Sequence, residues 1–134
     1  MIIPDTNVWS ELTRNAGNPR VLDWLEQHND VLWLSAIVIA EIRAGLESPQ
    51  AAAKRAGLEI WLHTLENEYR ERTLPFDPAA AHALGILLVT KPQQNKMLDT
   101  LLAAQAIAHD CQLATRNVKD FEWTGVKMLN PWDM

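Results

Sequence analysis

The hydrophobic positions of this chain fall into short apolar runs that alternate with longer stretches of helical periodicity. Short apolar runs bounded by Pro, Asp or Asn are typical of strands in a parallel sheet, because such strands are covered on both faces and need no polar alternation. Five segments predict strands in this way: 1–4, 31–34, 74–76, 112–115 and 127–129.

The segments between these runs carry apolar residues at helical spacing. Asn18-Pro19 is a helix-start signature, with Asn as N-cap and Pro at the first helical position, and Ser35 is a cap for the helix after it. The segment 50–72 is a long amphipathic helix, in one piece or in two around Gly57. The other predicted helices cover 5–14, a segment from 19, 36–46, 78–89 and 97–109.

This order of elements predicts an α/β fold. Strands separated by helices imply right-handed crossovers and a mainly parallel sheet of about four to five strands, flanked by helices on both sides. Domains most often contain roughly 100–150 residues, so the 134 residues predict one domain, 1–134.

Composition restricts the cellular compartment and the kinds of metal site that we expect. Cys111 is the only cysteine, which excludes an internal disulfide and a cysteine zinc site and fits a reducing cytoplasm. No segment approaches the roughly 18 uninterrupted apolar residues of a membrane span, so we expect a cytoplasmic protein. The net charge of −5 argues weakly against a general nucleic-acid coat, but not against an enzyme that acts on nucleic acid.

Four acids stand against apolar neighbours: Asp5, Glu41, Asp99 and Asp120. Asp5 ends the first strand, and ligands of open α/β sheets bind where the parallel strands end. Carboxylates are rarely buried unless they are paired or bound to metal, so acids in core-like segments indicate a common partner.

Each acid also has an ordinary structural reading. Asp5 could be an N-cap, Asp99 a first-turn acid that interacts with the helix dipole, and Asp120 a cap or turn residue. Glu41 is harder to explain in this way, because Arg43, two positions on, points elsewhere along the helix. A separate structural role for each acid becomes less convincing when all four acids have to be explained together.

The acids and their neighbours match a family pattern over nearly the whole chain. The chain resembles the PIN-domain ribonucleases, in particular the VapC-type toxins of bacterial type II toxin-antitoxin modules and the closely related FitB-like members. Pro4 and Leu98 depart from the usual pattern, but neither removes a predicted ligand. The matching pieces are Asp5-Thr6-Asn7, Leu34 to Glu41, Asp99 with Leu102-Ala103-Ala104, Ala114 to Asn117 with Asp120-Phe121, and Asn130-Pro131-Trp132.

The resemblance implies a Mg²⁺-dependent endoribonuclease, with Mn²⁺ as the other ion, whose four acids gather at the sheet edge. Hard divalent cations take oxygen ligands, which carboxylates provide. Asp5 and Asp99 are implied as ligands of the principal ion. Asp120 would hold this ion through water or bind a second one, and Glu41 would orient water or complete the shell. Hydrogen-bonding partners of the acids are expected at Asn7, Ser35, Thr115 and Asn117.

Contacts to other molecules also follow from the resemblance. Candidate RNA-phosphate contacts are Arg14, Arg43, Arg116 and Lys119, although such residues are more often solvated surface charges. Family members have a small antitoxin partner and usually form homodimers through apolar helix surfaces. The six tryptophans and the segment 50–72 are compatible with such a surface. The polar segment 91–96 leads into Asp99 and is expected to flank the site.

Other functions remain open at this point. The chain could be a nuclease of the same fold that processes RNA without a toxin role, which gene context would distinguish. It could also be a non-catalytic binding module, whose stability metal would not change. A phosphotransfer protein with Asp5 as nucleophile ranks third, because no second aspartate stands two residues on and the chain has no glycine-rich phosphate cradle.

Overall fold

The computed structural model describes residues 1–90 and 96–134, and its strands run parallel to one another. One sheet has the order β1-β4-β5 and a second pairs β2 with β3. A parallel bridge between Ile2 and Leu32 joins the two sheets, so the strands follow the order β3-β2-β1-β4-β5. The predicted parallel α/β arrangement is confirmed. The strands are β1 (Ile2–Pro4), β2 (Leu34–Ser35), β3 (Thr73–Leu74), β4 (Gln112–Ala114) and β5 (Met128–Leu129).

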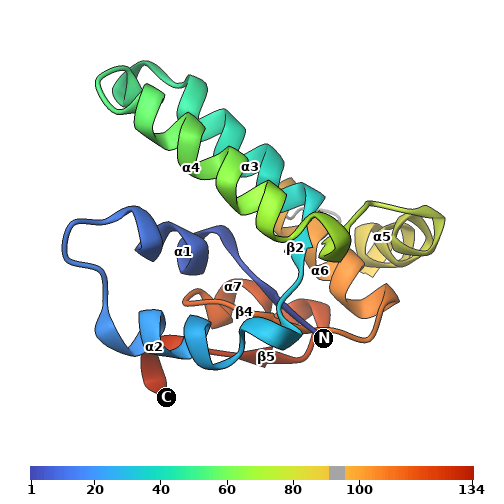
Figure 1. Ribbon diagram of the computed structural model, residues 1–134. Coiled ribbons are helices and arrows are strands. Elements are labelled where there is room, and N and C mark those ends of the chain that lie inside the picture. Colours follow the sequence, from blue (N-terminus) through green and yellow to red (C-terminus); the bar gives the residue numbers. More distant parts are fainter. Residues whose placement is uncertain (91–95) are drawn as a thin grey trace.

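Helices connect the strands and begin where the sequence signals them. The Asn18 side chain accepts from the N–H of Arg20, and that of Ser35 accepts from the N–H of Ile37, so both predicted N-caps form. Figure 1 shows α3 and α4 side by side as a hairpin, on the side of α1 opposite to α2. The helices are α1 (Thr6–Trp9), α2 (Pro19–Gln27), α3 (Ala36–Glu47), α4 (Arg55–Glu68), α5 (Pro78–Thr90), α6 (Met97–Ala108) and α7 (Val118–Phe121).

The second strand is shorter than the predicted segment 31–34. Residues Asn29–Val31 form a 3₁₀ turn, and β2 begins only at Leu34. The N–H of Val31 donates to the carbonyl of His28 (2.9 Å). The N–H of Val31 is therefore hydrogen-bonded in the turn that follows α2 and is not available for pairing with a neighbouring strand.

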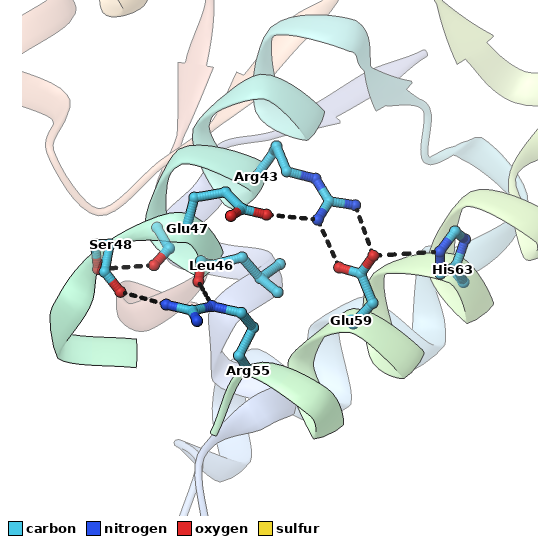
Figure 2. Close-up of polar contacts among 8 residues, drawn as sticks. Arg43, Leu46, Glu47, Ser48, Arg55, Glu59 and His63 are labelled. Carbon is cyan, nitrogen blue, oxygen red and sulfur yellow. Dashed lines mark hydrogen bonds and ion pairs between the residues drawn. The ribbon is translucent and has the colours of Figure 1, made fainter. Parts of the chain in front are cut away.

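The long helix predicted at 50–72 is also shorter, because the chain turns before it. α4 is one piece that contains Gly57 near its start. The Arg55 side chain donates to the carbonyl oxygens of Leu46 (2.7 Å) and Ser48 (3.0 Å), as Figure 2 shows. Arg55 thus binds the C-terminal end of α3 and fixes the turn between the two helices.

The core lies between the strands and the helices that connect them, and it takes up the large aromatic residues. Trp9 and Trp24 are buried, and the other four tryptophans pack against the core. The tryptophans therefore contribute to the core more than to an exposed apolar surface. Among the residues that the structure describes, no helix combines the length and apolar character needed to cross a membrane. The polar segment expected to flank the site lies outside the described residues, except for Lys96.

Candidate active site

The first acid is fixed at the edge where β1 and β4 end. The backbone N–H of Asp5 donates to the carbonyl of Ala114 (2.7 Å). The Asp5 carboxylate is 4% exposed and accepts hydrogen bonds from three donors. These are the Thr115 hydroxyl (2.8 Å), the Thr6 N–H (2.7 Å) and the Asn7 amide (3.3 Å). The bonds favour the charged form, but burial outweighs them and raises the pKa of Asp5.

The second acid, Glu41, comes from the middle of α3 and is half-buried. Burial, followed by the charges on Asp5 and Asp99, raises the pKa of Glu41 to about 7. The neighbouring Thr6 hydroxyl lowers this pKa only in part. Within the described part of the chain, Glu41 Oε1 is buried without a hydrogen-bond partner. An unpartnered buried oxygen is costly, so this atom is suited to bind a cation or a water molecule.

The third and fourth acids come from two further helices. Asp99 lies in the first turn of α6, and burial raises its pKa, with the charges on Asp5 and Asp120 adding to the rise. Asp120 lies in α7, and its Oδ2 is 2.8 Å from Nζ of Lys96. Each of the four acids therefore acts electrostatically on at least one of the others, as expected for groups that gather at one place.

A cleft of about 470 Å³ is lined by three of the acids, Asp5, Glu41 and Asp99. Asp120 instead lines a neighbouring polar pocket and pairs with Lys96. As the side chains stand, no three His, Cys, Asp or Glu residues in the ranges 1–90 and 96–134 form a ready set of metal ligands. The fourth carboxylate is paired with the Lys96 ammonium and does not line the cleft of the other three.

Three of the four expected hydrogen-bonding partners lie at the acids. Thr115 and Asn7 bind the Asp5 carboxylate directly. Asn117 donates its backbone N–H to the Thr115 hydroxyl (3.1 Å), so it helps to orient the group that donates to Asp5. Such bonds fix the direction in which a carboxylate presents its oxygens.

The fourth expected partner, Ser35, hydrogen-bonds between the helices that carry two of the acids. Its hydroxyl is fully buried, caps α3 and donates to Oε1 of Gln105 in α6. The Gln105 amide in turn donates to the carbonyl oxygens of Leu74 (2.8 Å) and Pro75 (2.9 Å). This network ties the helix that carries Glu41 to the helix that carries Asp99. Gln105 did not figure among the predicted residues, although an amide in an otherwise apolar helix was a signal for it.

The four basic candidates separate into different surroundings. Arg14 lines the cleft, but its Nη1 is 3.1 Å from Oε2 of the buried Glu11. Arg116 lines both the cleft and the polar pocket beside it. Lys119 lines that pocket only.

Arg43 lies outside the cleft, in a network between α3 and α4 (Figure 2). Its guanidinium contacts both carboxylate oxygens of Glu59 (2.6 and 3.1 Å) and one oxygen of Glu47 (3.3 Å). His63 stands 3.6 Å from the same Glu59 carboxylate. With these contacts Arg43 joins two helices and is not presented to the acids.

The donor set suits a hard divalent cation. The residues that line the cleft offer carboxylate oxygens and include no cysteine or histidine. Mg²⁺, Ca²⁺ and Mn²⁺ prefer such oxygen ligands. A cation there would offset the repulsion that raises the pKa of Glu41 and Asp99. Asp5, Glu41 and Asp99 are therefore the residues that could hold it, with Asp120 available if its pair with Lys96 opens.

Comparison with known proteins identifies the family of the chain. The PIN domain family matches residues 2–125. The chain is 37% identical to VapC ribonuclease Y4jK of Sinorhizobium fredii over 99% of both chains. It is 36% identical to toxin FitB of Neisseria gonorrhoeae, over 98% of this chain and 99% of FitB. The crystal structure of FitAcB from Neisseria gonorrhoeae superposes with a TM-score of 0.88 and 32% identity, over all of both chains. The chain belongs to the PIN-domain family.

Proposed function

We propose that this protein is a Mg²⁺- or Mn²⁺-dependent endoribonuclease and the toxin of a type II toxin-antitoxin module. The observation that carries the proposal is the cleft in which Asp5, Glu41 and Asp99 converge with raised pKa values. Three buried or half-buried acids in mutual repulsion lower stability, so their arrangement fits a site for a cation better than a structural role. The similarity to a VapC ribonuclease and to toxin FitB supports the choice of reaction.

We assign the principal ion to Asp5 and Asp99, with Asp120 reaching it through water or holding a second one. When bound, the ion would supply a nucleophilic hydroxide near neutral pH and neutralise charge on the phosphate. Thr115 and Asn7 hold the Asp5 carboxylate in one orientation. Oε1 of Glu41 has no partner in the described part of the chain, so it can accept a hydrogen bond from the attacking water and orient it.

The partners follow from the same reasoning. A toxin-antitoxin complex from Klebsiella pneumoniae contains a chain of the same fold (TM-score 0.73), and we propose that this chain likewise binds a cognate antitoxin and that it pairs with a second copy of itself. Exposed apolar side chains on α5, including Ile86 and Val89, offer a surface for that pairing. We place the protein in the cytoplasm, where its RNA substrate would be.

Two alternatives lead to different outcomes. A PIN nuclease that processes RNA without a toxin role would keep the same metal-dependent cleavage but would not arrest growth when expressed alone. A non-catalytic binding module would neither cleave RNA nor respond to metal. The raised pKa of Glu41 favours the two nucleases over the binding module, because a docking groove gains nothing from repelling acids.

The test is cleavage of total cellular RNA and purified tRNAs by the isolated protein with Mg²⁺ or Mn²⁺, beside a chelator. Asp99→Asn should reduce cleavage by about 100-fold or more, since loss of even an outer partner of a metal site costs roughly 10–100-fold. Asp23→Asn, at an exposed position of α2, is the matched control and should cleave like the wild type. Cleavage that survives both the chelator and Asp99→Asn would refute the assignment.

A further inference from the structure

An arginine and a tryptophan from distant parts of the sequence stack at the acid cleft. The Arg116 guanidinium carbon lies 5.2 Å from the centroid of the Trp132 ring, within the range of a cation–π contact. Both residues line the cleft that contains Asp5, Glu41 and Asp99. Arg116 is exposed, so the stack presents a cationic group directly beside the acids.

Both members of the stack are held by their own segments. The backbone N–H of Arg116 donates to Oδ1 of Asn7 (3.4 Å), and the Asn7 amide donates to Asp5. The backbone N–H of Trp132 donates to Oδ1 of Asn130 (2.9 Å), and the Trp132 carbonyl accepts from Arg20 (3.5 Å). Arg116 is therefore held by the side chain that also binds the first acid, and Trp132 is held by its own turn and by α2.

Position and charge together distinguish Arg116 from the other basic groups near the acids. Arg14 also lines the cleft but pairs with Glu11, and Lys96 pairs with Asp120. Lys119 has no ion pair among the described residues, but it lines only the neighbouring pocket. Within residues 1–90 and 96–134, no carboxylate lies within the 4.0 Å of an ion pair from the Arg116 guanidinium. Its five N–H donors are thus available to an anion from outside the chain, and a phosphate matches their fork.

We propose that Arg116 and Trp132 form a nucleotide subsite of the RNA-cleaving site, an inference that rests on the proposed function. The guanidinium binds the phosphate next to the one that is cleaved, and its open face stacks on the adjoining base. Trp132 is a positioning residue: it holds the guanidinium plane in place, so that less side-chain freedom is lost when RNA binds.

The residues around Arg116 and Trp132 favour RNA as the ligand of this subsite. The acids of the cleft repel phosphates, so a strand that reaches them needs a cationic contact close by. The neighbouring pocket that Arg116 also lines contains Lys119 and the amides of Asn117 and Asn130, which can donate to phosphate and base oxygens, beside three acids, Asp120, Glu122 and Asp133.

The experiment compares four variants on a short fluorescent oligoribonucleotide: Arg116→Ala, Arg116→Lys, Trp132→Ala and Trp132→Phe. Arg70→Ala is the control, because Arg70 is exposed and has no ion pair or side-chain hydrogen bond among the described residues. We measure KM and kcat with Mg²⁺ at several salt concentrations. Binding is measured separately by fluorescence anisotropy, with each change combined with Glu41→Gln, so that it does not depend on cleavage.

Arg116→Ala should raise KM and the dissociation constant about tenfold, the effect of one exposed hydrogen-bonded charge pair. The slope of log affinity against log salt should fall by about 0.7, the value for one phosphate of a single strand. Arg116→Lys should keep that slope but raise KM a few-fold, since lysine keeps the charge and loses the planar stack.

Trp132→Ala should raise KM roughly threefold to tenfold, as expected for a cation–π contact. Trp132→Phe should recover most of this loss, which a merely structural defect would not do. If all four variants match Arg70→Ala in KM, affinity and salt slope while the wild type cleaves RNA, the subsite is refuted and the proposed function stands. If neither the wild type nor any variant cleaves or binds RNA, both the subsite and the proposed function are refuted.

Discussion

Replacing Glu41 by glutamine should stabilise the metal-free protein, even though it removes a predicted catalytic group. Burial and the charges on Asp5 and Asp99 raise the pKa of Glu41 from 4.5 to about 7. One pKa unit corresponds to about 1.4 kcal/mol, so the ionised side chain destabilises the folded state by about 3 kcal/mol at most. Solvent screening of this half-buried group reduces the expected gain to roughly 1.5–3 kcal/mol.

The gain should depend on pH in a defined direction. Below the unfolded pKa of 4.5, Glu41 is protonated in both states and costs nothing. Between 4.5 and about 7, the unfolded chain releases the proton while the folded chain retains it, so wild-type stability falls as pH rises. Above pH 7 the folded carboxyl is ionised and the full penalty is present. The variant lacks this penalty, so its advantage should be about 1 kcal/mol at pH 5 and largest at pH 8.

Thermal unfolding with a chelator at pH 5 and pH 8 measures the effect. One kcal/mol corresponds to roughly 3–5 °C for a domain of this size, so we expect a rise of roughly 5–15 °C at pH 8. Glu71→Gln is the control, because Glu71 is exposed and removing its charge should change little at either pH. An equal or lower midpoint for Glu41→Gln at pH 8 would refute the electrostatic reasoning.

Magnesium should stabilise the wild type more than the Glu41→Gln variant. A cation that binds only the folded state stabilises it in proportion to its affinity, and it needs the ionised form of the acids. Wild-type protein at pH 8 should therefore gain more from added Mg²⁺ than Glu41→Gln does, and it should gain less at pH 5. An equal response of both proteins would exclude Glu41 from the ion's surroundings.

Two further changes test the frame and the assembly. Ser35→Ala leaves Oε1 of Gln105 without its donor and removes the cap of α3, so urea denaturation should show a loss of about 1–3 kcal/mol. Ser48→Ala is its control, because the Ser48 hydroxyl makes only an exposed hydrogen bond to the Gly45 carbonyl, and an equal small loss in both would contradict the role of the network. Ile86→Asp should convert the proposed homodimer to monomer in light scattering, because Ile86 is 67% exposed on α5. Ile60→Asp, 69% exposed on α4, should leave the mass unchanged; a dimer that survives Ile86→Asp would place the interface elsewhere.

The fold was accessible from the sequence wherever a local signal determined the structure. Asn18-Pro19 and Ser35 start helices through hydrogen bonds to neighbours two positions away, so their effect needs no knowledge of the rest of the chain. The limits of the second strand and of α4 were less accessible. They depend on backbone bonds at the end of α2 and on Arg55 reaching across to the end of α3.

The site was predictable as far as the acids and their near neighbours are concerned. Asp5 and Thr115 meet because β1 and β4 are adjacent parallel strands. The alternation of elements predicted parallel strands that end at one edge, but not which strands are neighbours. The pair of Lys96 with Asp120 and the stack of Arg116 on Trp132 had no such signal. Each joins side chains from separate segments, and only the packed chain determines which cation reaches which partner.

The structure also indicates how three repelling acids can be held together although none of them forms an ion pair within residues 1–90 and 96–134. Each sits on an element that is anchored by something other than the acid: Asp5 by the Ala114 carbonyl, and Glu41 and Asp99 by helices tied through Ser35 and Gln105. The repulsion therefore raises pKa values instead of displacing helices. A protein built in this way should bind a cation by moving acid side chains while its helices stay in place, and its frame should tolerate the loss of any single acid more easily than the loss of Ser35 or Gln105.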